Sequence, residues 1–442
     1  MAMGPARGQE ATRQVEMVCL DQLVRGDDLY RRIDGLVDWG FVRAAAGPYY
    51  ADAVGRPSVD PIVLLKLMLA GALEGIGSMR ELLRVAGRDL PLRRFLGYGL
   101  GERLPAHQTV SEAHSRRFVD ARVFEQAFQR TVALCAEHDL LDGSHLSVDG
   151  VHAEADAALA SLRASLALAA VPDEGGDELQ AEPEPPSTPQ LTLAEPRSGR
   201  TPKRRSSNAT SVSRTDPDAR LRGKPGQRPH LVHRGQVGVD PKARCVVACL
   251  GERADGYEGD GLSPILDRAR FACPELASVG ADQGYAAERV YKDAQGRRLT
   301  VYIPPQRTML PSGNEPRTEA EREAQAARAR CRTEAGIWAY KRRMADAEGV
   351  ISELKLRHGL GRARCRGTPL FHIQLLLGCA AINLKRLAKH VPEAGSSAGA
   401  APAAEAVDAI RVSGAHQAPG SSGSASPSPG VAMPWTVAVS LN

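Results

Sequence analysis

Two short apolar runs, each ending in an aspartate followed closely by glycine, constrain the fold of this 442-residue chain more than any other feature. His145–Val148 leads into Asp149-Gly150, and Ser278–Ala281 leads into Asp282-Gln283-Gly284. Short apolar runs bounded by turn residues are typical of buried β-strands. Adjacent strands of one sheet would bring both carboxylates to one point beside it, where glycine lets the main chain turn without crowding a ligand. Turn-forming aspartates are common, so two unrelated strand ends explain the same pattern.

Strand and helix signals alternate from residue 141 to residue 392. Further strands are expected at 235–240, 244–250 and 301–303, with a hairpin turn at Asp240-Pro241-Lys242. Helices are expected in the alanine-rich segment 153–170 and at 262–271, 286 onward, 318–347, 346–357 and 370–390. This order predicts a mixed α/β sheet flanked by helices.

The segment from residue 20 to 140 has the pattern of several short helices. Pro61–Leu73 is apolar on most sides, which predicts a buried helix. Ser78 and Glu81 predict a capped start for the next helix, and 123–138 carries one apolar stripe. Short helices joined by tight turns fit a DNA-binding helix-turn-helix domain and fit any other small helical bundle equally well.

Three segments are predicted to be flexible. They are the N-terminus 1–19, an insertion at about 171–211 and the tail 393–442. The insertion is rich in Pro, Glu, Ser and Arg without periodicity, and the tail consists largely of Ala, Gly, Ser and Pro. The insertion passes from acidic to basic, so its basic half is a solvated linker or a phosphate-binding stretch.

Composition excludes several classes of protein. The net charge of +5, from 57 Lys+Arg against 52 Asp+Glu, is too small to establish a nucleic-acid partner. The eight cysteines form no Cys-x-x-Cys pair and no zinc-finger spacing, which favours reduced thiols in the cytoplasm. No apolar signal segment begins the chain, and the longest apolar stretches, 61–73 and 373–384, are too short to span a bilayer. We therefore expect a soluble intracellular protein with no membrane partner.

A third acid is expected on the helix after Tyr340. On a helical wheel, Met344, Ala347, Ile351 and Leu354 form the core stripe, with Glu348 at its edge. Asp346 and Glu353 are expected to face solvent. Glu348 is therefore the acid that can reach the sheet end, although an ordinary surface pair with Lys355 explains its position too. Three carboxylates would suit Mg²⁺ or Mn²⁺.

Several motifs in chain order resemble the DDE transposases of bacterial insertion sequences, in the branch with Tyr, Arg, Glu and Lys around the last acid. The likeness runs over about residues 20–390 and rests on these segments: Ser58–Leu67, Leu104–Ser111, Ser147–Ala155, Ser213–Arg220, Gly235–Asp240, Gly280–Tyr285, Glu348–Lys355 and Arg362–Gly367. Where that branch has an arginine four residues before the glutamate, this chain has Met344. Arg342 and Arg343 are nearest, and regular helix geometry puts both off the Glu348 face.

The resemblance implies an α/β RNase H-like catalytic core at 141–392, an N-terminal all-helical DNA-binding domain at 20–140, and a disordered C-terminal tail. It implies two Mg²⁺ ions per active site, with Mn²⁺ possible, held by the catalytic residues Asp149, Asp282 and Glu348. The DNA-binding residues that it implies are Tyr340, Arg343, Lys355, Arg362, Arg364 and Arg366. The implied partners are double-stranded DNA, as transposon ends and as target, and a second copy of the chain. The implied place is the bacterial cytoplasm, at the nucleoid when bound to DNA.

Two other functions fit the same sequence. One is an RNase H-like nuclease that cleaves DNA without joining it, because its metal site would be the same. The other is a catalytically inactive DNA-binding descendant of a transposase, against which the presence of all three acids argues.

Overall fold

The structure is a computed structural model that describes residues 17–50, 58–120, 122–164, 208, 211–223, 228–311 and 315–392. The predicted tail at 393–442 lies outside these residues, as do most of the predicted N-terminal segment and most of the insertion at 171–211.

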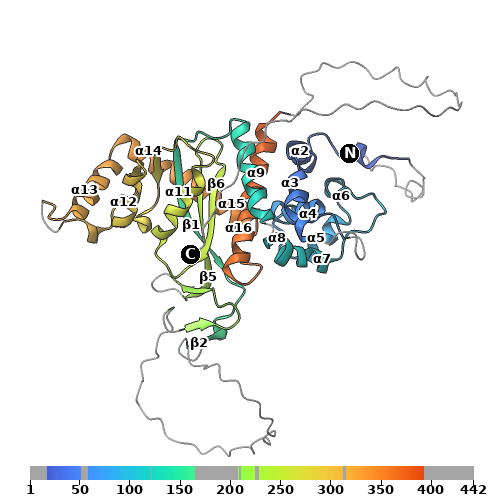
Figure 1. Ribbon diagram of the computed structural model, residues 1–442, viewed down its shortest axis with the longest axis horizontal. Coiled ribbons are helices and arrows are strands. Elements are labelled where there is room, and N and C mark those ends of the chain that lie inside the picture. Colours follow the sequence, from blue (N-terminus) through green and yellow to red (C-terminus); the bar gives the residue numbers. More distant parts are fainter. Residues whose placement is uncertain are drawn as a thin grey trace, which may run out of the picture. The chain divides into compact units, whose positions relative to one another are not determined.

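Helices fill the N-terminal part of the described chain, as predicted (Figure 1). In chain order they are α1 (Leu20–Leu23), α2 (Leu29–Leu36), α3 (Gly40–Ala46), η2 (Gly47–Tyr49), α4 (Pro61–Leu73), α5 (Met79–Ala86), α6 (Leu90–Leu96), α7 (His107–Glu112), the π-helical η3 (Ala113–Arg117), α8 (Phe118–Asp120) and α9 (Val123–Glu137).

Helix α4 lies at the centre of these helices because its sequence is apolar all round. Every residue from Leu67 to Leu73 is buried. Its start is defined by Pro61 at the first turn and by Asp60, whose side chain accepts from the Ile62 N–H at 3.0 Å. The predicted cap of α5 is also present, since Ser78 accepts from the Glu81 N–H at 3.4 Å.

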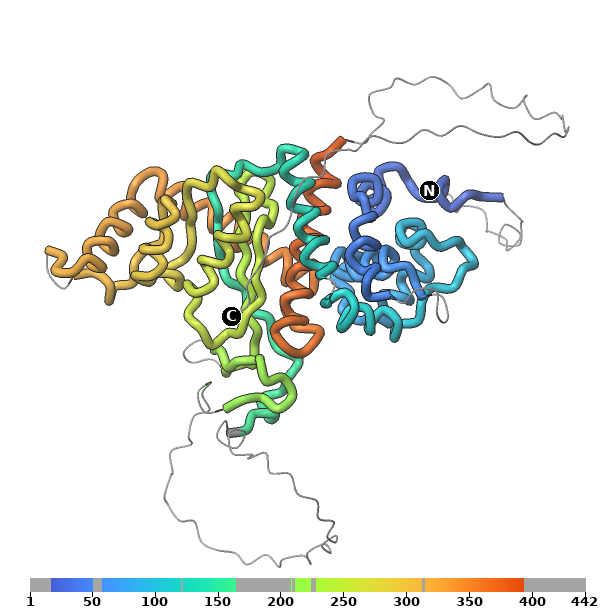
Figure 2. Tube along the Cα trace, in the orientation of Figure 1, coloured from blue at the N-terminus to red at the C-terminus, as the bar shows by residue number. Residues whose placement is uncertain are grey.

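The second part of the chain forms a six-stranded sheet, so the predicted α/β class is confirmed (Figure 2). Its strands are β1 (His145–Glu154), β4 (Arg220–Arg222), β5 (His230–Val239), β6 (Val246–Arg253), β7 (Ser278–Gly280) and β8 (Thr300–Tyr302). The order is β4-β5-β1-β7-β8, and β6 pairs with β5. Strand β5 runs antiparallel to β1 and β6, whereas β1, β7 and β8 are parallel. A separate ribbon pairs β2 (Leu162–Ala164) with β3 (Ser211–Ser213).

Strand β1 corrects two expectations. It does not end before Asp149 but continues to Glu154, because β5 pairs with it as far as Val232. The helix expected over 153–170 is wrong for the residues that can be described there, which form the end of β1, the turn η4 (Leu159–Ser161) and β2. Pairing with a neighbouring strand has overridden the helix propensity of alanine.

The remaining helices follow the predicted order, except that the single helix expected over 318–347 is divided at Arg332 and Thr333 into two helices. In chain order, the remaining helices and turns are the turn η5 (Glu258–Gly261), α11 (Leu262–Ala269), the turn η6 (Gln283–Tyr285), α12 (Glu288–Gly296), the turn η7 (Arg307–Met309), α13 (Glu319–Cys331), α14 (Glu334–Arg343), the π-helical η8 (Met344–Glu348), α15 (Gly349–Arg357) and α16 (Thr368–His390).

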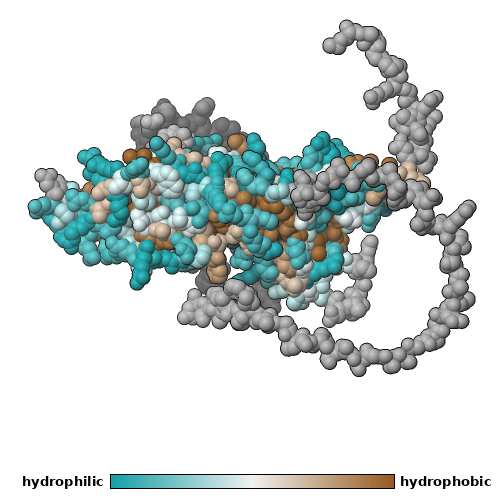
Figure 3. Space-filling view, turned by 90° about the horizontal axis from the view of Figure 1, so that it is seen from above, coloured by the Kyte–Doolittle hydropathy of each residue, from teal (hydrophilic) through white to brown (hydrophobic). Residues whose placement is uncertain are grey.

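Helix α16 is the core helix that joins the sheet to the N-terminal helices. It contacts β6, α9 and α4, and Figure 1 shows it alongside α9. Its Asn383 is fully buried and is satisfied by the main chain of Val246, accepting from the N–H and donating to the carbonyl at 2.8 Å each. By length and composition α16 could cross a membrane, but 72% of its most apolar stretch is buried within the protein. Figure 3 shows hydrophilic residues over much of one face, with smaller apolar patches.

Candidate active site

Asp149 and Asp282 stand at the same level of the sheet because their strands are parallel neighbours. Ser147 pairs with Gly280, and each aspartate lies two residues beyond its member of that pair. Asp149 remains within β1, opposite Val237 of β5, whereas β7 has already ended before Asp282. The two carboxylates are therefore brought together by the register of β1 and β7, and not by two strands that end at the aspartates.

A nearby glycine N–H donates a hydrogen bond to each of the two aspartates. The Asp282 Oδ1 atom accepts from the Gly284 N–H at 2.9 Å and so caps the turn η6. The Asp149 Oδ1 atom accepts from the Gly150 N–H at 2.7 Å. Main-chain donors thus orient one oxygen of each carboxylate and leave the other free to contact a further group.

The third acid, Glu348, is the last residue of the π-helical turn η8, which lies between α14 and α15. A π turn holds one residue more than an α turn, with bonds from residue i to residue i+5. Arg343 lies five residues before Glu348, so the π turn brings these two side chains onto one face. The Arg343 Nη1 atom lies 2.9 Å from Glu348 Oε1.

The same Arg343 nitrogen also lies 3.1 Å from Asp149 Oδ2, so one guanidinium joins the first and third acids. The expectation that Arg343 lies off the Glu348 face is therefore wrong. It assumed a regular α-helix of 3.6 residues per turn, which the π turn interrupts. The Arg343 side chain is only 10% exposed and also lies over the Tyr340 ring, 5.8 Å from its centroid.

Two other acids lie in positions that differ from the expected ones. Asp346 does not face solvent but is fully buried, with its Oδ2 atom 2.9 Å from Arg342 Nε. Glu353 is 15% exposed and is paired with Arg386 at 2.6 Å. Met344, assigned to the core stripe, is instead 45% exposed. One inserted residue rotates the helix surface by about 100°, which accounts for the positions of Met344 and Asp346. Glu353 lies in the regular helix after the turn, and its packing against Arg386 of α16 accounts for its burial.

Burial and the neighbouring negative charges disfavour the ionised form of the carboxylates at this site. Burial raises the pKa of Asp149 to about 6, the Gly150 N–H and the Arg343 charge oppose this, and the charges of Asp282 and Glu348 add to it. Burial also raises the pKa of Asp282, and the Glu258 charge raises it further. Perturbed carboxylates grouped at one place are typical of functional sites.

The donors present fit a divalent cation of the Mg²⁺ type, which prefers carboxylate oxygens. The side chains do not close on one point, however, since no group of three or more Asp, Glu, His or Cys side chains in the described parts of the chain could hold a metal ion as they lie. Arg343 supplies the positive charge between Asp149 and Glu348 instead. Beside these acids, the buried Tyr285 hydroxyl has no hydrogen-bond partner in the described structure.

Two of the predicted phosphate-binding side chains are exposed near the acids. Tyr340 is 55% exposed on α14, and Lys355 is exposed on α15. Burial, followed by the charges of Arg222, Arg234 and Lys355, lowers the pKa of His152 to about 4, so the Lys355 ammonium lies near β1.

The three arginines of the segment 362–366 separate into two groups. Arg362 and Arg366 are exposed, and both lie beside Asp156, at 3.4 and 3.6 Å. Arg364 points inward, donating to the His358 carbonyl at 3.4 Å, and a Cβ on Gly77 would lie 3.2 Å from its Nε atom. Arg364 thus packs against the loop before α5, while its two neighbours remain accessible.

Two known protein families match segments of this chain, one in its N-terminal part and one in its C-terminal part. Residues 18–116 match a family described as "Transposase domain (DUF772)", and residues 311–388 match a family described as "Transposase DDE domain". The chain therefore carries two transposase domains, the second of the DDE type. The first match covers the N-terminal helices of this transposase from α1 to α7, and the second covers Arg343 and Glu348 but neither aspartate. No curated protein and no solved structure matches the chain.

Two residues that lie at the site of this transposase are not predicted as site residues from the sequence. Tyr285 is the last residue of the Gly280–Tyr285 motif, but only the fold buries its hydroxyl among the acids. Glu258 lies in the turn η5, in a glycine-rich stretch without an apolar pattern, and no sequence signal identifies it.

Proposed function

We propose that this transposase binds the inverted repeats at transposon ends and performs metal-dependent DNA strand cleavage followed by strand transfer. The observation that carries the proposal is that one Arg343 nitrogen contacts both Asp149 and Glu348. Asp282 lies level with Asp149, just beyond the end of the neighbouring strand β7. The acids come from three separate elements far apart in the chain. The strand order β6-β5-β1-β7-β8, with only β5 antiparallel, supports an RNase H-like core.

Asp149, Asp282 and Glu348 are the residues that would hold the metal, as Mg²⁺ or Mn²⁺. Bound there, two divalent ions would activate the attacking oxygen and stabilise the leaving 3′-oxygen of a phosphodiester. The chain's own contribution is to place three carboxylates whose charge is poorly compensated. Arg343, freed from Asp149 and Glu348, is within reach of a phosphate, for which a guanidinium is a suitable ligand.

DNA contacts are proposed for both parts of the chain. Tyr340, Lys355, Arg362 and Arg366 are exposed and supply aromatic or cationic groups for the strand near the acids. Such phosphate contacts provide affinity without sequence choice. We assign recognition of the repeats to the helices of residues 20–140, and the joining of two ends to a dimer.

The test is cleavage of a supercoiled donor plasmid that carries the inverted repeats flanking the coding sequence. Asp149→Ala, Asp282→Ala and Glu348→Ala should each abolish cleavage while DNA binding in a gel-shift assay is retained. Chelation by EDTA should abolish cleavage by the unaltered protein, and added Mg²⁺ or Mn²⁺ should restore it. Glu275→Ala, which removes an exposed acid from the loop before β7, serves as the control that keeps activity.

The products decide between this proposal and its rivals. Nicked donor without joined products would favour a nuclease. Binding without cleavage by the unaltered protein would favour an inactive descendant. Unchanged cleavage by any of the three alanine variants would refute the assignment of that acid.

A further inference from the structure

Glu258, in the turn η5, presents a fourth carboxylate beside Asp282. A Cβ on Gly284 would lie 2.5 Å from Glu258 Oε2 and 2.9 Å from Asp282 Oδ1, so both oxygens border one small space. Glycine at position 284 is what leaves room for the two carboxylates to approach each other.

Close packing fixes Glu258 at this position. The buried Gln236 of β5 donates from Nε2 to the Glu258 carbonyl at 2.9 Å. A Cβ on Gly261 would lie 1.9 Å from the same Gln236 nitrogen, and one on Gly259 would lie 3.0 Å from the Tyr285 carbonyl. The turn η5 is therefore held against the sheet and against η6 by contacts that only glycine permits.

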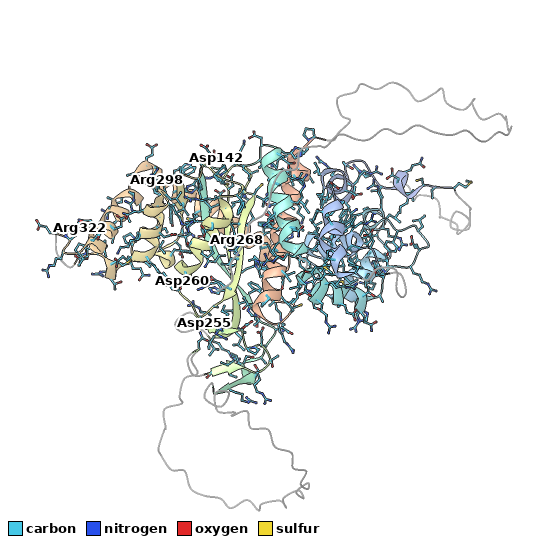
Figure 4. The ribbon with its side chains drawn as sticks, in the orientation of Figure 1. Asp142, Asp255, Asp260, Arg268, Arg298 and Arg322 are labelled. Carbon is cyan, nitrogen blue, oxygen red and sulfur yellow. The ribbon has the colours of Figure 1, made fainter. Side chains whose placement is uncertain are left out.

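No cation compensates these two carboxylates in the part of the chain that the structure describes. Neither Glu258 nor Asp282 forms an ion pair there, whereas Asp260 in the same turn is paired with Arg289 (Figure 4 labels Asp260). Arg343 is bonded to Asp149 and Glu348 instead. Two like charges held together without a counter-ion are unfavourable unless a cation binds between them.

The Tyr285 hydroxyl is an independent indication of a ligand. Tyr285 is completely buried, and its hydroxyl has no hydrogen-bond partner among the described residues. It lies 3.5 Å from the position of a Cβ on Gly150, and the charges of Asp149, Asp282 and Glu258 all act on it. A buried hydroxyl without a partner is energetically unfavourable, so a metal-bound water is a suitable acceptor or donor for it.

We propose that Glu258 is an additional metal ligand, which lets Asp282 and Glu258 hold a divalent cation while Arg343 still joins Asp149 to Glu348. This inference rests on the proposed function, because Asp282 is shared. It adds a fourth ligand to the three acids of the proposed function. It also implies that one ion binds before Arg343 moves and before DNA binds.

The experiment is a titration of the full-length protein with Mn²⁺ in the absence of DNA, followed by calorimetry and by electron paramagnetic resonance of free Mn²⁺. The variants are Glu258→Gln, Glu258→Asp and Asp282→Asn, with Asp260→Asn as the control that removes an acid two residues away. Circular dichroism of the metal-free proteins checks that each variant folds. Glu258→Asp keeps the charge and shortens the side chain by one methylene, so it provides a second measure if Glu258→Gln fails to fold.

We expect Glu258→Gln to weaken Mn²⁺ binding by about tenfold or more, Glu258→Asp to weaken it less, and Asp260→Asn to leave it unchanged. Asp282→Asn should abolish this binding. If Asp282→Asn loses the ion but Glu258→Gln binds it as the unaltered protein does, Glu258 is not a ligand and the proposed function stands. If the unaltered protein binds no Mn²⁺, this inference is wrong, and the donor cleavage assay alone decides the proposed function.

Discussion

The π turn η8 leads to a test by deletion of single residues. Ala345 is exposed inside the π turn, and Ser352 is exposed in the regular helix α15 that follows. Removing Ala345 leaves Arg343 and Glu348 four positions apart, with three residues between them. In an α-helix, residues four apart differ by only about 40°, so the two side chains stay on one face. We therefore expect deletion of Ala345 to convert the π turn into an α turn and to keep the ion pair.

Deletion of Ser352 should have the opposite result. It rotates the rest of α15 by about 100° and puts Lys355 at the position of Leu354, which is completely buried. Loss of a buried leucine costs about 2–5 kcal/mol, and burial of an ammonium adds to that cost. The deletion of Ala345 should change the free energy of unfolding by about 1 kcal/mol or less, because it removes a side chain that is exposed.

Urea denaturation in EDTA, followed by circular dichroism, measures both free energies without depending on DNA or metal. Donor cleavage then tests whether the variant without Ala345 keeps its activity, as the restored pairing predicts. The reasoning is refuted if deletion of Ala345 destabilises the protein as much as deletion of Ser352. In that case the π turn is required for the fold and does not merely accommodate one extra residue.

Three further predictions follow from single side chains. The pKa of Asp149 is about 6 in the folded protein against an ordinary 3.8, so its charge destabilises the fold by up to about 3 kcal/mol above pH 6 and by nothing below about pH 4. Asp149→Asn in EDTA should therefore be more stable than the unaltered protein at pH 7.5 and equal to it at pH 4 by urea denaturation; lower stability at pH 7.5 would contradict this. His358, whose Nε2 atom lies 3.8 Å from Glu353 Oε1, and Arg386, bonded to Glu353 Oε2 at 2.6 Å, hold the pKa of Glu353 at about 2. Glu353→Gln should therefore cost about 1–3 kcal/mol at pH 7, and that difference should disappear as the pH falls from about 4.5 toward 2. Arg364→Ala should lower the melting temperature with little effect on DNA affinity, whereas Arg366→Ala should weaken DNA binding and reduce its salt slope by about one; equal effects of the two variants on DNA binding would refute the division between them.

The elements with strong local patterns could be predicted from the sequence. Pro61–Leu73 is apolar on most sides, so it had to be buried wherever it packed. The hairpin of β5 and β6 follows from two apolar runs around Asp240-Pro241-Lys242. The alanine-rich segment after β1 could not be predicted in this way, because the partner strand that extends β1 lies about eighty residues further along the chain.

The sequence by itself determined which acids to consider, because Asp149 and Asp282 each follow an apolar run and precede a glycine, and Glu348 lies in the motif of a known family. Only the tertiary structure decided how these acids are arranged. The parallel register of β1 and β7 sets Asp149 level with Asp282, and the π turn brings Arg343 to Glu348. The turn η5 then adds Glu258, which has no local pattern of its own. Register, helix phase and loop packing depend on contacts between residues distant in sequence, and no local periodicity records them.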